Sequence, residues 1–329
     1  MAAVRSRRGG SRLLPAALAA VAVFLVMRFT SSTQCQLEHA TAVGGGSRSS
    51  AWPLGSSWFP GSQPLPSMTQ RCGDKVDEER FKAYTAYHPS IHGWMADQHP
   101  GVLKALTELQ HEKCIVGSVG EIGTHHGRFF FALAATAAPD EKLLAIDLYE
   151  DQGKNIDASG GTDTSKRTEF KKHAHALGWP EGAITILSAD STTLTPANYT
   201  THGFPAFRLF SVDGGHAYET TLSDMELAAR IMHKGGIVIV DDFVNNAWLG
   251  VLDGVVTFTR TTKTGYVPFL WTCTKIYFCH RSHHEMYLDF VRTKYDCTSS
   301  SSLRPPSYSI GGVQLCVVDP KQCTWSGLQ

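Results

Sequence analysis

Acidic residues stand at the ends of several apolar segments of this 329-residue sequence. One example is "FSVDGGHAYE", in which an apolar run meets Asp213, two glycines and His216. Carboxylates are rarely buried without a partner, so an acid in this position usually faces a ligand, a metal ion or the start of a helix. The acids that end or closely follow apolar runs are Glu121, Asp147, Asp190, Asp213, Asp241 and Asp242.

The apolar segments alternate with helix-like stretches. Five short runs, "CIVGSVGEI", "KLLAIDL", "AITILSAD", "FRLFSVD" and "GGIVIVDD", are separated by stretches such as 164–177 and 218–234. This alternation predicts an α/β, Rossmann-like, doubly wound and mainly parallel sheet with both faces covered. Two later runs, "GYVPFLW" and "KIYFCH", are close enough to form a terminal antiparallel pair.

The carboxyl ends of parallel strands meet at one edge of a sheet, where ligands bind. At the first strand end, Glu121 is followed by Gly123 and Gly127, which allow a tight turn and a close approach to a ligand. Asp147 lies 20 residues beyond Gly127, a spacing that suits a carboxylate bound to ribose hydroxyls. Asp190 is a candidate for a base edge. These five residues predict a nucleotide-type cofactor site, although purely structural turns use the same glycines.

A second group of acids follows the fourth and fifth strands. Asp213, Asp241 and Asp242 are expected to converge, and three close carboxylates repel one another unless a cation lies between them. Oxygen ligands suit Mg²⁺, or Mn²⁺ or Ca²⁺, which would bind a substrate hydroxyl and lower its pKa. His216 is the candidate general base beside Asp213.

Each of these assignments has a structural alternative. Asp213 could cap the helix that follows, and one member of the acidic pair could point away from the site. His216 could hydrogen-bond the backbone of its own turn. His125 and His126 are expected simply to occupy the glycine turn.

The motifs together resemble a known family. The E-x-G-x-x-x-G turn, "DGGHAYE" and "GGIVIVDDF" are similar to those of class I S-adenosylmethionine-dependent methyltransferases, in the small-molecule O-methyltransferase branch with a D-G-x-H-x-Y motif (methyltransferase domain 24-like). The resemblance covers roughly 102–280. It implies that Glu121, Gly123, Asp147 and Asp190 line the site of S-adenosylmethionine, and that a hydroxyl of a small molecule is methylated with the help of a divalent cation. The resemblance says little about the substrate, and a sugar or other glycan hydroxyl is expected as the acceptor only if the N-terminal leader makes the chain luminal.

Two other functions fit parts of the pattern. An NAD-dependent oxidoreductase would also place an acid such as Asp147 on a ribose, but the second glycine of G-x-G-x-x-G is absent here. A membrane-tethered binding or scaffold module could keep the fold without catalysis. Thirty basic residues balance thirty acidic ones, so no global field favours nucleic acid as a partner.

The N-terminal region differs in composition from the rest. Four arginines precede the apolar run 13–27, which predicts a signal peptide or signal anchor over 1–30. A Gly/Ser/Pro-rich linker is expected over 31–73, the methyltransferase domain over 74–297 and an irregular, Cys-containing tail over 298–329. These features indicate a single-pass type II protein of the endomembrane system or Golgi lumen, or a secreted protein. Organellar import is the alternative.

Cysteine positions agree with a luminal location. Five of the eight cysteines lie in the last quarter of the chain, where disulfides would stabilise the tail. Cys114 is expected to be a small buried residue outside any disulfide. The sequence "NYT" at Asn198 is a glycosylation acceptor if the chain is luminal.

Overall fold

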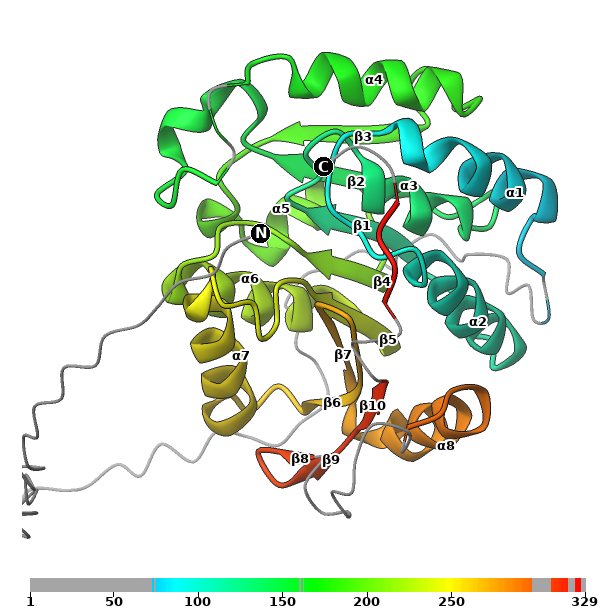
Figure 1. The fold of residues 1–329 in the computed structure, drawn as a ribbon, viewed down its shortest axis with the longest axis vertical. Coiled ribbons are helices and arrows are strands. Elements are labelled where there is room, and N and C mark those ends of the chain that lie inside the picture. The colour runs from blue at the N-terminus through cyan, green and yellow to red at the C-terminus, as the bar shows by residue number, and fades with distance from the viewer. Residues whose placement is uncertain are drawn as a thin grey trace, which may run out of the picture. The chain divides into compact units, whose positions relative to one another are not determined.

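The computed structural model describes residues 73, 75–159, 161, 163–297, 309–318 and 323–326. The predicted leader, and all of the predicted linker except residue 73, lie outside these ranges. Within them, no helix combines the length and the apolar character that crossing a bilayer requires. Figure 1 shows the arrangement of the helices and strands.

An eight-stranded sheet in the order β10-β6-β7-β5-β4-β1-β2-β3 forms the centre of the fold. Strands β1 to β5 are parallel, whereas β7 pairs antiparallel with both β5 and β6. This topology confirms the predicted doubly wound sheet with its terminal antiparallel pair. The strands are β1 (Ser118–Ile122), β2 (Leu143–Asp147), β3 (Ile184–Ser188), β4 (Phe207–Val212), β5 (Met232–Val240), β6 (Tyr266–Thr272), β7 (Lys275–His280) and β10 (Cys316–Val318).

Helices cover both faces of the sheet, as Figure 1 shows for α6 and α7 on one side and α1, α2 and α3 on the other. Side chains alternate along each strand, so Leu209 of β4 packs into one hydrophobic cluster and Phe210 into the other. The helices are α1 (Glu78–Tyr87), α2 (His99–Glu112), α3 (Arg128–Ala135), α4 (Lys166–Ala176), α5 (Pro196–Thr201), α6 (Tyr218–Ile231), α7 (Leu249–Thr261) and α8 (His284–Lys294).

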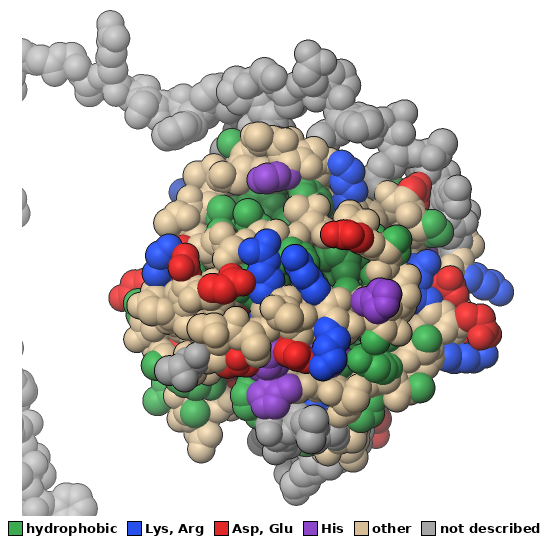
Figure 2. Space-filling model, turned by 90° about the horizontal axis from the view of Figure 1, so that it is seen from above, with side chains coloured by type: hydrophobic (Ala, Val, Ile, Leu, Met, Phe, Trp, Pro, Cys, Tyr) green, Lys and Arg blue, Asp and Glu red, His purple; other side chains and the backbone are tan. Residues whose placement is uncertain are grey.

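Acidic and basic side chains are interspersed on the face seen in Figure 2. Exposed ion pairs form along helices, such as that of Lys172 with Glu169 on α4, whose charged atoms are 3.0 Å apart. Exposed pairs of this kind contribute little to stability, about 0.2–1 kcal/mol each. Exposed ion pairs of this kind therefore do little to hold the fold together.

The structure corrects two expectations about elements. The helix predicted over 218–234 ends at Ile231, because the chain enters β5 at Met232 and pairs there with Phe207 of β4. The tail is not wholly irregular, since it forms the short pair β8 (Ser309–Ile310) and β9 (Val313–Gln314) and then adds β10 to the edge of the sheet.

Disulfides join the tail to the domain. Cys297 is bonded to Cys316, and Cys273 is bonded to Cys323. Cys279, by contrast, is free and buried within β7. The expectation for Cys114 is wrong, because this residue is disulfide-bonded. It lies in the partly exposed turn before β1 rather than in the strand itself.

Candidate active site

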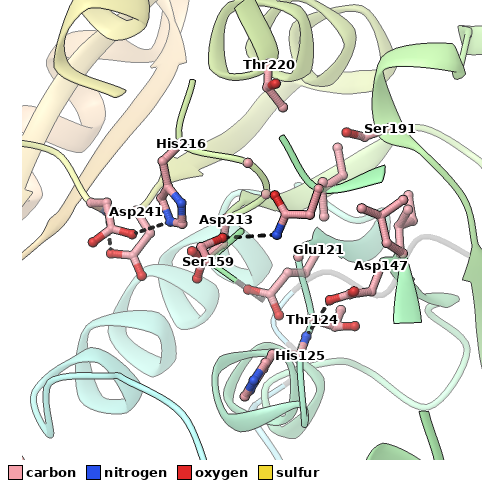
Figure 3. A pocket seen from close by; sticks show the side chains of 18 of the residues that line it. Glu121, Thr124, His125, Asp147, Ser159, Ser191, Asp213, His216, Thr220 and Asp241 are labelled. Carbon is pink, nitrogen blue, oxygen red and sulfur yellow. Dashed lines mark hydrogen bonds and ion pairs between the residues drawn. The ribbon is translucent and has the colours of Figure 1, made fainter. Parts of the chain in front are cut away.

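A cavity of about 880 Å³ opens at the carboxyl ends of the parallel strands. All six strand-end acids line it, together with Gly123 and His216. Figure 3 shows Glu121 and Asp213 near its centre, with His216 and Asp241 to one side and Asp147 to the other. The parallel sheet therefore brings together the acids that the sequence places on five different strands.

The two glycines of the first turn both have a positive φ, as a tight turn requires, but only one of them lines the cavity. Gly123 has φ +86°, and a Cβ atom there would lie 1.7 Å from the backbone oxygen of Asp213. Gly127 has φ +95° at the start of α3, where a Cβ would overlap the ring of Phe131. Gly127 is absent from the cavity lining. These glycines allow the turn to pack against the protein itself, and only Gly123 reaches the cavity.

Asp147 holds the turns after β1 and β2 together. Its Oδ2 accepts the backbone N–H of His125 at 2.7 Å, and its Oδ1 accepts that of Tyr149 at 2.9 Å. A carboxylate oxygen can accept more than one hydrogen bond, so Asp147 can still accept ribose hydroxyls from the cavity side. It is therefore both an organiser of the loops and a candidate cofactor ligand.

Asp190 caps the short 3₁₀ helix Ser191–Thr193 that follows β3. Its Oδ1 accepts the backbone N–H of Thr192 at 3.0 Å and the hydroxyl of the same residue at 2.7 Å. Beneath it, the Ser191 hydroxyl donates to Asp224 of α6 at 3.0 Å. Asp224 is fully buried, and this burial raises its pKa to about 7. The sequence reasoning missed Asp224, because it lies within a helix and not at a strand end.

A lysine lies among the acids that were predicted to hold a metal ion. Lys275, the first residue of β7, is fully buried, and its Nζ lies 2.5 Å from Asp241 and 3.3 Å from Asp213. The same Nζ is 3.9 Å from the centroid of the Phe129 ring. The hydroxyl of Thr274 also donates to Asp241, at 2.7 Å. An ammonium group of the protein thus supplies a positive charge between these carboxylates.

Burial and neighbouring charges shift the pKa values of this group in different directions. Burial alone would lower the pKa of Lys275, but Asp213, Asp241 and Glu121 together raise it. Burial would raise the pKa of Asp241, but Lys275 outweighs it and lowers that pKa. The pKa values of Asp213 and Glu121 are raised, by burial first and then by a neighbouring carboxylate. Lys275 and Asp241 therefore form the charged pair.

Glu121 presents an unsatisfied oxygen in this group. The residue is 1% exposed, and its Oε1 has no hydrogen-bond partner among the described residues. Buried polar atoms are normally paired, so an orphaned acceptor that lines a cavity indicates a position for a donor from a ligand. The cofactor-binding role of Glu121 stays a prediction.

His216 lies between two carboxylates. Its Nε2 is 3.0 Å from Asp242 Oδ2, and its Nδ1 is 3.0 Å from Asp157 Oδ2. The imidazole also stacks on Trp248, with ring centroids 4.1 Å apart. Burial would lower the pKa of His216, but the hydrogen bond to Asp242 and the surrounding acids raise it. The ring is thus held by side chains and not by the backbone of its turn.

Asp213 does not cap the following helix. The N-cap of α6 is Ala217, and no side-chain hydrogen bond is made at that position. Asp157, which orients His216, was not among the predicted site residues. It comes from the polar segment after β2, where a single acid among many gives no pattern that a sequence argument could use.

A divalent cation could be held by a set that differs from the predicted one. Single ligand atoms of Asp213, His216 and Asp242 all lie within 4.8 Å of one another. Asp241 does not join this set, because Lys275 and Thr274 occupy its oxygens. Two carboxylates and one imidazole are chemically suited to a divalent ion such as Mn²⁺.

The sequence of this region matches a known family. Residues 121–243 match the family model described as a methyltransferase domain, which begins at the first strand-end acid and ends just after the acidic pair of β5. This match confirms the resemblance to the S-adenosylmethionine-dependent methyltransferases that the motifs indicate. A search of curated protein sequences gives no match.

Solved structures of O-methyltransferases are also similar. The O-methyltransferase NovP is 16% identical over 56% of this chain and 80% of its own, with a TM-score of 0.46. A TDP-rhamnose 3'-O-methyltransferase of calicheamicin biosynthesis is 17% identical over 55% and 77%, with a TM-score of 0.41. An O-methyltransferase from Bacillus cereus is 12% identical over 61% and 87%, with a TM-score of 0.38. At these scores the likeness carries no argument about the substrate.

Proposed function

We propose that this chain, whose residues 121–243 form a methyltransferase domain of the S-adenosylmethionine-dependent class, methylates a hydroxyl group of a small molecule or sugar. The observation that carries the proposal is the position of His216. Its ring is fixed between Asp157 and Asp242, at one end of a cavity whose other end contains Asp147 and Asp190. One cavity therefore combines a candidate base with a candidate nucleoside site.

The chain's own residues can hold the cofactor in one orientation. Asp147 would accept the ribose hydroxyls, Asp190 would contact the base edge, and Glu121 would accept a donor at its unpaired Oε1. When bound, S-adenosylmethionine supplies a methyl group on a positively charged sulfur. The Asp242 carboxylate faces the same cavity and would favour that charge.

His216 would take the proton of the acceptor hydroxyl. The freed electron pair on that oxygen would form the bond to the methyl group that bound S-adenosylmethionine supplies, and the electron pair of the S–CH₃ bond would remain on sulfur. Asp157 and Asp242 would stabilise the imidazolium that forms and keep the ring in place. Stacking on Trp248 further limits rotation of the ring.

Exposed hydrophobic side chains that line the cavity favour an acceptor molecule with an apolar face. Three of the large hydrophobic residues that line it are exposed: Trp94 at 57%, Ile156 at 73% and Trp325 at 42%. Exposed aromatic and aliphatic side chains around a concave site commonly bind ligands. A sugar ring or an aromatic ring could stack on them while its hydroxyl points to His216.

A divalent cation is the second way to activate the acceptor. Mg²⁺, Mn²⁺ or Ca²⁺ held by Asp213, His216 and Asp242 would supply a Lewis acid for the acceptor oxygen. In that arrangement His216 is a ligand and cannot use the same nitrogen as a base. Activity that survives complete chelation would support His216 as the base, and activity restored only by added metal would support the cation.

Cofactor binding by the full-length chain tests the proposal. Asp147→Ala should weaken S-adenosylmethionine binding in calorimetry by about 100-fold, because two hydrogen bonds to a charged acceptor are lost. Asp151→Ala is the matched control, since Asp151 is an exposed acid nearby that does not line the cavity. NAD should give no heat of binding.

Two results would overturn the proposal. One is folded protein that binds no S-adenosylmethionine, which would favour a scaffold role. The other is an Asp147→Ala variant that binds the cofactor as tightly as the wild type. Circular dichroism of the variants separates loss of the site from loss of the fold.

We also propose that the protein resides in the lumen of the endomembrane system. The disulfides Cys273–Cys323 and Cys297–Cys316, together with the disulfide of Cys114, support an oxidising compartment. Asn198 of the predicted glycosylation site is exposed on α5. Treatment of the expressed protein with an endoglycosidase should lower its apparent mass, and an unchanged mass in both wild type and Asn198→Gln would contradict luminal glycosylation.

A further inference from the structure

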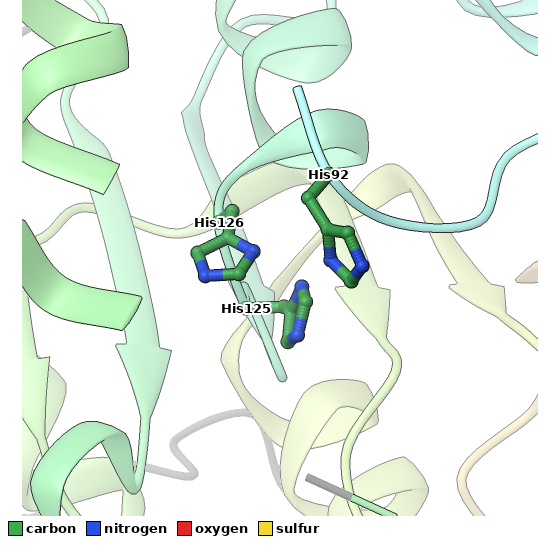
Figure 4. Close-up of side chains that lie close together, drawn as sticks. All are labelled: His92, His125 and His126. Carbon is green, nitrogen blue, oxygen red and sulfur yellow. The ribbon is translucent and has the colours of Figure 1, made fainter. Parts of the chain in front are cut away.

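Three histidines form a cluster beside the cavity, apart from the acids described above. His92 comes from the segment before α2, and His125 and His126 come from the turn between β1 and α3. The ring centroids of His125 and His126 are 4.1 Å apart, and that of His92 is 5.3 and 5.2 Å from them. Figure 4 shows the three rings gathered around one point.

One nitrogen atom of each ring is not satisfied by the described part of the protein. The Nδ1 atom of each of the three is buried and has no hydrogen-bond partner among the described residues. Buried nitrogens of this kind normally have a hydrogen-bond partner, because leaving one unpaired destabilises the folded state. The three rings pack against one another, but this packing supplies no hydrogen-bond donor or acceptor for the unpaired nitrogens. Three unpaired nitrogens in one place therefore point to a missing ligand.

We propose that His92, His125 and His126 together bind a transition-metal ion of the Zn²⁺ type. One ring nitrogen from each residue lies within 4.8 Å of the others. Three nitrogens at 2.0–2.1 Å from a tetrahedral ion are about 3.4 Å apart, so small rotations of the rings about χ2 bring them into position. Imidazole ligands suit Zn²⁺, Cu²⁺, Ni²⁺ and Co²⁺, whereas Mg²⁺ and Ca²⁺ prefer oxygen.

Asp163 provides independent support for this site. Its Oδ2 lies 3.1 Å from the Nε2 of His126, so the ring can donate its proton there and leave the lone pair of Nδ1 free. Metal-binding histidines commonly have such a carboxylate behind them, which fixes the tautomer and the orientation of the ring. Burial lowers the pKa of nearby Lys166, while the charges of Asp147 and Asp163 raise it.

The position of the site suggests what the ion would do. His92 and His125 line the cavity, so a fourth coordination position can face it and take a water or an oxygen of a bound molecule. The ion would also join the segment before α2 to the turn after β1, and so fix one wall of the cavity. The site is distinct from the Asp213, His216 and Asp242 set and does not depend on the proposed methyl transfer.

Titration of the full-length chain with Co²⁺ and Zn²⁺ tests the inference. We expect one ion per chain to bind through these histidines, with visible absorption of four-coordinate Co²⁺. His92→Gln and His126→Gln should each weaken binding by at least about 100-fold, and Asp163→Asn by roughly 10–100-fold. His175→Gln, an exposed histidine of α4, is the matched control. His216→Gln should leave this binding unchanged, which separates the two clusters.

X-ray absorption of the Zn²⁺-loaded wild type gives a result even if the variants fold poorly. Three imidazole nitrogens in the first shell would support the site. A shell made mainly of oxygen, no binding of either ion, or equal affinity in wild type, His92→Gln and His126→Gln would each overturn it.

Discussion

Lys275→Met should lower the free energy of unfolding by about 3–5 kcal/mol, because it leaves buried carboxylates without their cation. Lys275 is fully buried and contacts Asp241 and Asp213, while Glu121 adds a further acid nearby. Methionine keeps most of the length and the apolar stem of lysine. The loss of unfolding free energy would therefore come from the missing charge and not from a cavity. Urea unfolding at neutral pH measures it.

A double-mutant cycle provides the control for this prediction. Adding Asp241→Asn to Lys275→Met should recover part of the stability, since the uncompensated charge is removed as well. Lys263→Met, at an exposed position, should change stability by less than about 0.5 kcal/mol. A loss below 1 kcal/mol in Lys275→Met, or a double variant that is no better than the single one, would contradict the charge-pair interpretation.

His216→Gln should reduce the rate of methyl transfer by about 1,000-fold, within the range of 10²–10⁴ that a positioned acid–base group supplies. Binding of S-adenosylmethionine should stay nearly unchanged, because His216 lies at the other end of the cavity from Asp147. Single-turnover transfer from labelled cofactor to an accepted substrate measures the rate, and calorimetry measures the binding. His202→Gln, an exposed histidine, is the matched control.

The pH dependence gives a second readout for His216. A general base acts in its neutral form, so kcat/KM should rise with pH through the pKa of His216, which its carboxylate partners raise above the ordinary value. Asp157→Asn removes one of these partners and should move that rise to lower pH. A profile that is the same in wild type and Asp157→Asn, or a His216→Gln variant of full activity, would exclude the role.

The arrangement of charges connects these two predictions. Lys275 pairs with Asp241 at the end of β5 and also contacts Asp213, which leaves Asp242 to interact with His216. Without that lysine, three carboxylates would share one edge of the sheet, as the sequence alone suggests. The lysine therefore determines which acids can interact with a bound molecule.

The sequence by itself determined the sheet and the positions of the strand-end acids, because both depend on the local pattern of apolar and polar residues. Runs of apolar residues alternating with helical stretches specify a parallel sheet, and a parallel sheet places every strand end at the same edge. For that reason the positions of Glu121, Asp147, Asp190 and Asp213 at one cavity could be predicted without a structure. The antiparallel pair β6 and β7 was predicted from its spacing in the same way.

Only the tertiary structure decided which groups surround those acids. Lys275 reaches Asp241 because β7 inserts between β5 and β6, and Asp157 reaches His216 from a polar loop. His92 meets His125 because the segment before α2 packs against the turn after β1. Such contacts join residues that are distant in the sequence, so the local periodicity of apolar residues does not predict them. Gly127 was expected to lie close to a ligand, but it packs against the protein instead. A tight turn needs the positive φ of glycine whether the turn faces a ligand or the protein itself, so the sequence could not distinguish the two cases.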